Sequence, residues 1–355
     1  MSTITAQERV RLALQHKEAD RIPIHDSPWE ATVDRWHSEG LPQHVGVDEF
    51  FGYEIVQLGA DLSPMLPTRV LERTDEYITE TTSYGGIRRN HRDRSTTPEI
   101  IDYGLKSRQD WEAIKKRLQP SYTRVDWVTA RALYEKARYE KKFIAYSGIH
   151  GYDLCQLYMR SDELLVLLLT DPDWIRDIVE THADLTIEMA KIMMAEGFQF
   201  DGAFLYEDMG YRKSSLFSPR TYRQVFKSSD KRLYDFFHAH NMPIILHSCG
   251  NVKALIPDLL DIGLNCLQPL EVKAGMDLLE LKREYGNHLA FMGGIDVRAM
   301  SAEDPTAIER EIATKIPVAK KGGGYIYHSD HSVPNNVSLA QYQRVMELVR
   351  KYGTY

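Results

Sequence analysis

Short apolar runs alternate with amphipathic segments from about residue 143 to the end of the chain. The segments between and after these runs have the pattern of helices that bury one face, at about residues 162–196, 219–241, 252–262, 276–285, 305–320 and 338–352. The runs themselves have the length and the β-branched or aromatic content of buried strands, and we expect strands at Phe143 to Ser147, Gly202 to Tyr206, Pro243 to His247, Leu264 to Gln268, Leu289 to Met292 and Tyr325 to His328. Strands that alternate with helices are typical of βαβ units in a parallel sheet.

The first 140 residues have a different pattern, with many charged residues and only short helix-like and strand-like segments. We expect a helix over Thr3 to His16, a short strand over Arg21 to His25 and a β-ribbon over residues 68–104 that turns at Gly85-Gly86. The basic segment Arg88 to Arg94 is interpreted either as a solvated loop or as a lid that meets an anionic ligand or a partner.

Six βα units, completed by strands from the first part of the chain, favour an α/β fold of the (β/α)8 TIM-barrel type. An open doubly wound sheet is the alternative, although no G-x-G-x-x-G follows a first strand, which weakens a dinucleotide-binding interpretation. We predict one domain over residues 1–355, in which residues 1–140 contribute an N-terminal α+β extension.

Composition narrows the class of protein. A length of 355 residues and a hydrophobic content of 43% suit one barrel with extensions. The formal net charge of −7 argues against general nucleic-acid binding, which needs a basic surface. Three cysteines suggest no disulfide framework, and we find neither an apolar leader nor a run of about 20 apolar residues. The sequence therefore predicts a cytoplasmic protein without a membrane span, and the N-terminal region leaves room for homodimer contacts.

Residues able to do chemistry follow five of the predicted strands. In a parallel barrel the C-terminal strand ends form one rim, where catalytic groups gather because the loops that follow are free to vary. The five rim segments are Tyr206-Glu207-Asp208, His247-Ser248-Cys249, Gln268 to Glu271, Gly293 to Asp296 and His328 to His331. Each contains a carboxylate, an imidazole or a thiol.

The pair His247-x-Cys249 is the best candidate for a metal site. Residues i and i+2 of an extended chain project to the same side, and imidazole with thiolate suits zinc. The alternative is an ordinary buried histidine and cysteine in the barrel wall. Further ligands are expected from Glu207 or Asp208, and from His331.

The remaining rim residues have more than one interpretation. Asp296 either binds substrate or caps a helix before Ser301, and Glu271 either binds substrate or pairs with Lys273. The residues predicted to bind substrate are Trp29, Tyr206, Glu271, His328 and Asp330. Cys155 and Cys266 lie outside the rim and are expected to be structural.

An ordered block of motifs over residues 243–335 is the most specific part of the chain. His247-Ser-Cys-Gly-Asn-Val252, Phe291-Met-Gly-Gly-Ile-Asp296 and Gly322-Gly-Gly-Tyr-Ile326, with the opening Asp20-Arg-Ile-Pro23, resemble the uroporphyrinogen decarboxylase superfamily. The resemblance implies a distorted (β/α)8 barrel. It also implies one of two activities, which are cofactor-free decarboxylation of a tetrapyrrole and methyl transfer.

The N-terminal region separates the two activities. True decarboxylases of the superfamily carry the motif P-V-W-x-M-R-Q-A-G-R, whose arginines hold the substrate carboxylates, and the matching segment Ile22 to Glu30 lacks them. The resemblance therefore favours the methyltransferase branch, whose members work with corrinoid proteins or with a thiol acceptor. Those similar to methylcobamide:coenzyme M enzymes bind zinc through H-x-C and a later cysteine. His247 and Cys249 match the first two ligands, and His331 stands at about the place of the missing cysteine.

The resemblance thus implies a zinc-assisted methyltransferase. It would move a methyl group from a small methylated substrate, such as a methoxylated aromatic, to a corrinoid protein. That corrinoid would come with a partner, because this chain has no D-x-H-x-x-G signature. The implied metal ligands are His247, Cys249, Glu207 and His331, and the implied catalytic residues are Glu207, Asp208, His247, Asp296 and His331. The alternatives are a cofactor-free decarboxylase and a non-catalytic binding protein, although the density of ionisable groups at the rim argues against the latter.

Overall fold

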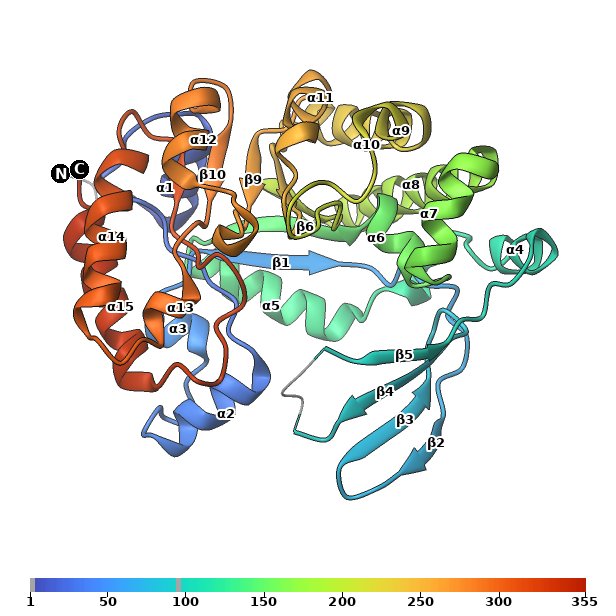
Figure 1. Ribbon diagram of the computed structural model, residues 1–355, viewed down its shortest axis with the longest axis horizontal. Helices are drawn as coiled ribbons and strands as arrows, with labels where there is room; N and C mark the ends of the chain where they lie inside the picture. The colour runs from blue at the N-terminus through green and yellow to red at the C-terminus, as the bar shows by residue number, and fades with distance from the viewer. Residues whose placement is uncertain (1–3, 94–96) are drawn as a thin grey trace.

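The computed structural model describes residues 4–93 and 97–355 (Figure 1). Within these residues, seven parallel strands form a curled sheet in the order β1-β6-β7-β8-β9-β10-β11. The strands are β1 (Ile55–Gly59), β6 (Phe143–Ile149), β7 (Gly202–Tyr206), β8 (Ile244–His247), β9 (Cys266–Gln268), β10 (Ala290–Met292) and β11 (Tyr325–Ile326). The six strands predicted from residue 143 onward are confirmed, and their spatial order follows their order in the sequence.

The sequence predicts eight barrel strands, one more than the described residues form. The segment Ile22 to His25 makes only an isolated parallel bridge, between Ile24 and Tyr327. It is hydrogen bonded toward β11 on one side, where the His25 amide donates to the Tyr327 carbonyl over 3.1 Å. On the other side the Glu54 amide, just before β1, donates to the Ile24 carbonyl over 2.9 Å. Pro23 has no amide to donate toward β11, so the pairing stays a bridge.

Helix α1 (Ala6–Leu14) covers the N-terminal strand ends, opposite the predicted rim. Its buried residues Val10, Ala13 and Leu14 pack with inward-facing strand residues such as Phe143 and Ile245 in one apolar cluster. Thr5 caps the helix by accepting a hydrogen bond from the Glu8 amide over 3.1 Å. The predicted N-terminal helix is therefore confirmed over residues 6–14, while Thr3 lies outside the described residues.

The predicted β-ribbon over residues 68–104 is a separate four-stranded antiparallel sheet. Its strands are β2 (Val70–Arg73), β3 (Tyr77–Thr81), β4 (Ile87–His91) and β5 (Glu99–Asp102). The basic segment is not a loop over its first four residues, because residues 88–91 belong to β4. There Arg88 pairs with Glu80 on β3 at 2.7 Å. Arg94 lies outside the described residues.

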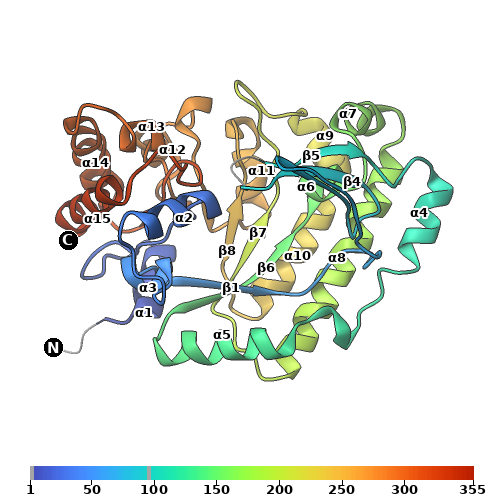
Figure 2. The ribbon, with the colours of Figure 1, turned by 90° about the horizontal axis from the view of Figure 1, so that it is seen from below.

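Helices cover the outer face of the curled sheet (Figure 2), where α5 (Trp127–Tyr139) lies beside β1 and β6, and α10 (Lys227–Ala239) lies beside β8. The predicted helix over 162–196 is two helices, α7 (Ser161–Thr170) and α8 (Pro172–Ala195), because proline cannot continue a helix but suits a first turn. The segment 219–241 likewise divides into α9 (Pro219–Val225) and α10 (Lys227–Ala239). The other α-helices are α2 (Glu30–Ser38), α3 (Val47–Phe51), α4 (Arg108–Lys115), α5 (Trp127–Tyr139), α6 (Gly151–Gln156), α11 (Ile256–Asp261), α12 (Leu278–Tyr285), α13 (Val297–Met300), α14 (Thr306–Ala319) and α15 (Leu339–Gly353). None of the described helices has the length and apolar character needed to span a bilayer.

Candidate active site

A cavity of about 350 Å³ opens at the C-terminal ends of β7, β8 and β9. Segments far apart in the sequence meet there, because the ends of parallel strands share one rim. Among the described residues that line it, none is an arginine or a lysine. The lining residues are Ser27, Trp29, Thr97, Phe204, Tyr206, Asp208, His247, Cys249, Gln268, Pro269, His328, His331 and Ser332.

Three of these residues form a compact group of metal-type donors. Asp208, His247 and Cys249 offer a carboxylate oxygen, an imidazole nitrogen and a sulfur that all lie within 4.8 Å of one another. His247 Nε2 is 3.4 Å from Asp208 Oδ1 and 3.4 Å from Cys249 Sγ. The Cys249 amide also donates to Asp208 Oδ1 over 2.7 Å, which holds the carboxylate next to the sulfur. We call this group the active-site cluster.

Gln268 at the end of β9 sets the tautomer of His247. Its amide oxygen lies 2.5 Å from His247 Nδ1, and since an amide oxygen only accepts, Nδ1 carries the proton. The lone pair of Nε2 is then free to face Asp208 and Cys249. The Gln268 amide nitrogen donates in turn to His328 Nε2 over 3.2 Å, which fixes the orientation of the glutamine. A second ring nitrogen bonded in this way is typical of histidines that bind metals.

Burial is the main influence on the titration of the active-site cluster. It lowers the pKa of His247, so the imidazole is neutral and can act as a ligand. Burial, reinforced by the carboxylate of Asp208, raises the pKa of the Cys249 thiol. A cation between the three side chains reverses the effect on the cysteine, because a coordinated thiol loses its proton. The nitrogen, oxygen and sulfur donors therefore fit a Zn²⁺ ion, and a four-coordinate site would keep one place for water or substrate.

Glu207 does not face the active-site cluster, so the prediction that it shares an ion with His247 is wrong. Its side chain is completely buried. Glu207 Oε1 accepts a hydrogen bond from the Tyr152 amide over 3.0 Å, and Oε2 lies 3.3 Å from His150 Nε2. Successive residues of an extended chain project to opposite sides. Asp208, the alternative considered for the same segment, therefore faces the cavity when Glu207 faces away from it.

His331 lines the cavity without belonging to the three-donor group. Its ring stacks on that of Trp29, with centroids 6.4 Å apart. Tyr206 lies on another part of the wall, where its ring centroid is 5.0 Å from that of His247 and its hydroxyl donates to Gln57 Oε1 over 2.9 Å. Trp29, Tyr206, His328 and His331 are thus the other predicted site residues that the structure brings to this cavity.

Three further predicted residues lie away from the cavity lining and have structural contacts. Asp296 caps α13 by accepting from the Arg298 amide over 2.8 Å, so the capping alternative describes it. Glu271 accepts from the Gly250 amide over 2.7 Å and pairs with Lys273 at 3.1 Å. Asp330 is buried and accepts from the amides of Val272 and Val297 over 3.0 and 2.9 Å. Cys155 and Cys266 are completely buried, as expected of structural cysteines.

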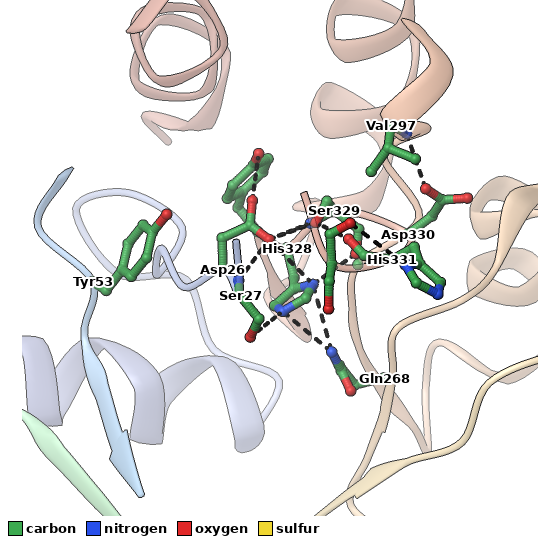
Figure 3. A network of polar contacts seen from close by, with 12 residues as sticks. Asp26, Ser27, Tyr53, Gln268, Val297, His328, Ser329, Asp330 and His331 are labelled. Atoms are coloured by element: carbon green, nitrogen blue, oxygen red, sulfur yellow. Dashed lines mark hydrogen bonds and ion pairs between the residues drawn. The ribbon is translucent and has the colours of Figure 1, made fainter. Parts of the chain in front are cut away.

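Asp26, which was not predicted from the sequence, anchors His328 and Ser329 beside the cavity (Figure 3). This buried carboxylate accepts hydrogen bonds from the Tyr342 hydroxyl over 2.8 Å and from the hydroxyls of Tyr327 and Ser329. Its Oδ1 lies 3.6 Å from Nδ1 of His328. The signal was available, because Asp26 directly follows the predicted strand Arg21 to His25 and so holds a rim position.

A curled parallel sheet with metal-type donors at its C-terminal rim defines an α/β barrel-like protein with a candidate metal centre. Residues 93–352 match the model of the family described as uroporphyrinogen decarboxylase (URO-D). The chain belongs to this family, as the motifs over residues 243–335 predict.

Individual proteins are similar to the chain at different levels. A solved methyltransferase from Methanosarcina mazei shares the fold, with a TM-score of 0.66 and 14% identity over 98% of this chain and 99% of that one. The methylcobamide:CoM methyltransferase MtaA of Methanosarcina barkeri is 38% identical over 80 residues, which are 22% of each chain. A methylated-thiol–coenzyme M methyltransferase of Methanosarcina mazei is 27% identical over 128 residues, 36% of this chain and 32% of that protein. The matched segments cover less than a third of either curated relative.

Proposed function

We propose that the chain is a zinc-dependent methyltransferase that moves a methyl group from a small methylated substrate to a corrinoid carried by a partner protein. The observation that carries this proposal is the meeting of Asp208, His247 and Cys249 at one cavity on the C-terminal rim. The names of the two curated relatives, which act on a methylcobamide or a methylated thiol, support methyl transfer as the reaction class. A cytoplasmic location and a homodimer remain parts of the same proposal.

Each residue of the site has a task in this reaction. Zn²⁺ bound by Asp208, His247 and Cys249 would supply a Lewis acid for the charge that develops on the substrate heteroatom. Gln268 keeps His247 in the tautomer that can bind. The methyl carbon leaves the heteroatom without the bonding electron pair and is taken by the reduced corrinoid, and the heteroatom takes up a proton. His331, at the cavity wall, is the residue placed to supply or orient that proton.

The cavity favours a small aromatic substrate. Its volume of about 350 Å³ lies near the lower end of the range for ligand sites. The rings of Trp29, Phe204, Tyr206 and His331 offer flat walls on which another ring can stack. A methoxylated aromatic fits these walls. A porphyrinogen rich in carboxylates does not, because the described lining contains neither arginine nor lysine to pair with them.

The test is a methyl-transfer assay with zinc-loaded protein and free cob(I)alamin. The donors are methoxylated aromatics, methanol, methylamines and methylated thiols, and formation of methylcobalamin is followed by absorbance. We expect turnover with one donor class, with methoxylated aromatics the strongest candidates, and no decarboxylation of uroporphyrinogen in a parallel incubation. Decarboxylation of uroporphyrinogen without any methyl transfer would contradict the proposal.

The glutamine that orients His247 yields a separate prediction. We expect Gln268→Leu to weaken zinc binding by about 10- to 100-fold, because the imidazole loses the partner that fixes its tautomer and ring orientation. A competition titration with a chromophoric chelator measures this affinity. The matched control is Gln268→Glu, which keeps an acceptor oxygen opposite His247 Nδ1 and should bind zinc at least as tightly as the wild type. Equal affinities for Gln268→Leu and the wild type would show that this contact does not orient the ligand.

A further inference from the structure

A second group of metal-type donors lies next to the active-site cluster, and the proposed reaction does not use it. His150, Glu207 and Asp230 each offer one ligand atom, and these atoms lie within 4.8 Å of one another. His150 Nε2 is 3.3 Å from Glu207 Oε2 and 3.7 Å from Asp230 Oδ1. The side chains are 3%, 0% and 0% exposed, so the group is sealed from solvent. It joins the residue after β6, the residue after β7 and the buried face of α10.

The atoms that face one another have no hydrogen-bond partner among the described residues. They are Nε2 of His150, Oε2 of Glu207 and Oδ1 of Asp230. The outer oxygens are satisfied, since Glu207 Oε1 accepts from the Tyr152 amide and Asp230 Oδ2 accepts from the Tyr222 hydroxyl over 2.8 Å. Buried polar atoms are nearly always paired. Three unpaired atoms that face one another from three different elements therefore indicate a partner that all three share. A cation is the partner that lone pairs from three such atoms can share.

Charge and spacing point to a divalent ion. As metal ligands, two ionised carboxylates and a neutral imidazole would carry two negative charges, whose burial is costly unless a positive charge compensates them. Ligand atoms about 2.0–2.2 Å from one zinc ion lie roughly 3–3.6 Å from one another, close to the spacing around His150 Nε2. A donor set with an imidazole favours first-row transition metals over Mg²⁺ or Ca²⁺.

The backbone leaves room for one of these carboxylates. Gly151 has a φ of +59°, in the left-handed region that favours glycine. A Cβ atom at this position would lie 1.7 Å from Glu207 Oε1, so any other residue would displace the Glu207 carboxylate. Glycine at position 151 therefore leaves the space that the Glu207 carboxylate occupies in the group.

We propose that His150, Glu207 and Asp230 bind a second divalent transition-metal ion, Zn²⁺ or Mn²⁺, sealed in the interior. This ion has a structural role, because it fixes Glu207 and thereby the neighbouring Asp208 of the active-site cluster. An ion sealed in this way leaves only when the surrounding elements open, whereas the active-site cluster exchanges its ion through the cavity. The inference is independent of the proposed function, because its test counts ions and measures no turnover.

The competing arrangement replaces the ion by protons. Burial lowers the pKa of His150, but Glu207 and Asp230 outweigh it and raise this pKa to about 9. Burial, followed by the charge of Glu207, raises the pKa of Asp230 well above its usual value. An imidazolium, a carboxylate and a carboxylic acid would then be neutral together without any metal. An ion count separates the two arrangements.

The experiment uses the Cys249→Ser variant, which weakens the active-site cluster and leaves the second group intact. The purified variant, grown with zinc and manganese, is dialysed in its native state against a chelator, and its metal is counted by mass spectrometry. We expect about one Zn²⁺ or Mn²⁺ per chain to remain, and none after unfolding in guanidinium chloride with the chelator. A folded protein that holds no ion after expression and native dialysis overturns the proposal.

Two further variants test the ligands. In the Cys249→Ser background, Asp230→Asn should abolish the retained ion. The matched control Tyr222→Phe should keep it, because Tyr222 contacts only the outer oxygen of Asp230. If Asp230→Asn does not fold, His150→Gln removes a different ligand and serves the same purpose. A folded Asp230→Asn or His150→Gln variant that retains the full ion content would overturn the assignment of the ligands.

Discussion

Replacing His247 by alanine is expected to remove the zinc that a chelator can extract and to lower kcat/KM for methylcobalamin formation by roughly 10³-fold or more. His247 Nε2 lies 3.4 Å from each of the other two donors, so its loss leaves a carboxylate and a thiol that do not share a third ligand. Loss of a Lewis acid removes several kcal/mol of transition-state stabilisation, and each 1.36 kcal/mol corresponds to about a factor of ten in rate. Steady-state kinetics and the zinc content of the same preparation measure both effects.

His288→Ala is the control for this prediction. His288 is an exposed histidine that does not line the cavity, so its removal changes the histidine count without touching the site. We expect its zinc content and its kcat/KM to match those of the wild type. If His247→Ala also retained full zinc and full activity, the active-site cluster would not be the centre of the reaction.

Replacing Glu54 by alanine is expected to lower the free energy of unfolding by about 3 kcal/mol, the lower end of the cost of breaking a buried ion pair, because Asp20 still pairs with Arg9. Glu54 is 3% exposed and pairs with Arg9 of α1, which is itself buried. It also accepts from Arg21 Nη1 over 3.0 Å and from the Ile24 amide over 2.7 Å. The substitution leaves the Ile24 amide without its partner and the Arg9 guanidinium with Asp20 as its remaining carboxylate, at the point where α1, the segment Ile22 to His25 and β1 meet.

Chemical denaturation measured by circular dichroism tests the effect of Glu54→Ala. The matched control is Asp102→Ala, which breaks an ion pair with Lys106 in which both side chains are more than half exposed. Exposed pairs contribute little, so we expect no measurable change in this variant. Equal stabilities of the two variants would show that the Glu54 contacts do not hold the N-terminal segment to the sheet.

The strands from residue 143 onward were predictable because each is a short apolar run bounded by turns and helices. Strand β1 was not, since Ile55–Gly59 has a polar residue at its centre and is followed by an antiparallel ribbon in place of a helix. The Ile22 to His25 segment is hydrogen bonded to β11 on one side and to the residue before β1 on the other. It makes too few backbone hydrogen bonds to form a strand. Such pairing depends on neighbours distant in the sequence, which local patterns do not contain.

The residues of the candidate site could also be predicted only in part. His247 and Cys249 could be predicted as a pair because the period of two puts both on one side of the chain. The choice between Glu207 and Asp208 could not be predicted, since a shift of one residue reverses the side that each faces. His150 was missed because β6 extends to Ile149, two residues beyond the predicted end. Asp230 lies on a helix, and only tertiary packing brings it to the group.

The single domain over residues 1–355 stays a prediction, as does the role of His331 as a fourth ligand. The position of its ring beside Trp29 in the cavity wall makes His331→Ala the natural variant for a later titration of the metal site. The assay with the four donor classes identifies the methyl donor, and the corrinoid partner stays a prediction.

The central claim is that Cys249 and His247 bind one zinc ion at the rim of the sheet. Zinc K-edge X-ray absorption of the zinc-loaded protein, compared with the Cys249→Ser variant, tests it most directly. The account predicts a sulfur neighbour at about 2.3 Å beside nitrogen and oxygen neighbours at about 2.0–2.2 Å in the wild type, with the sulfur absent from the variant. A wild-type spectrum without sulfur, or one that Cys249→Ser leaves unchanged, would contradict it.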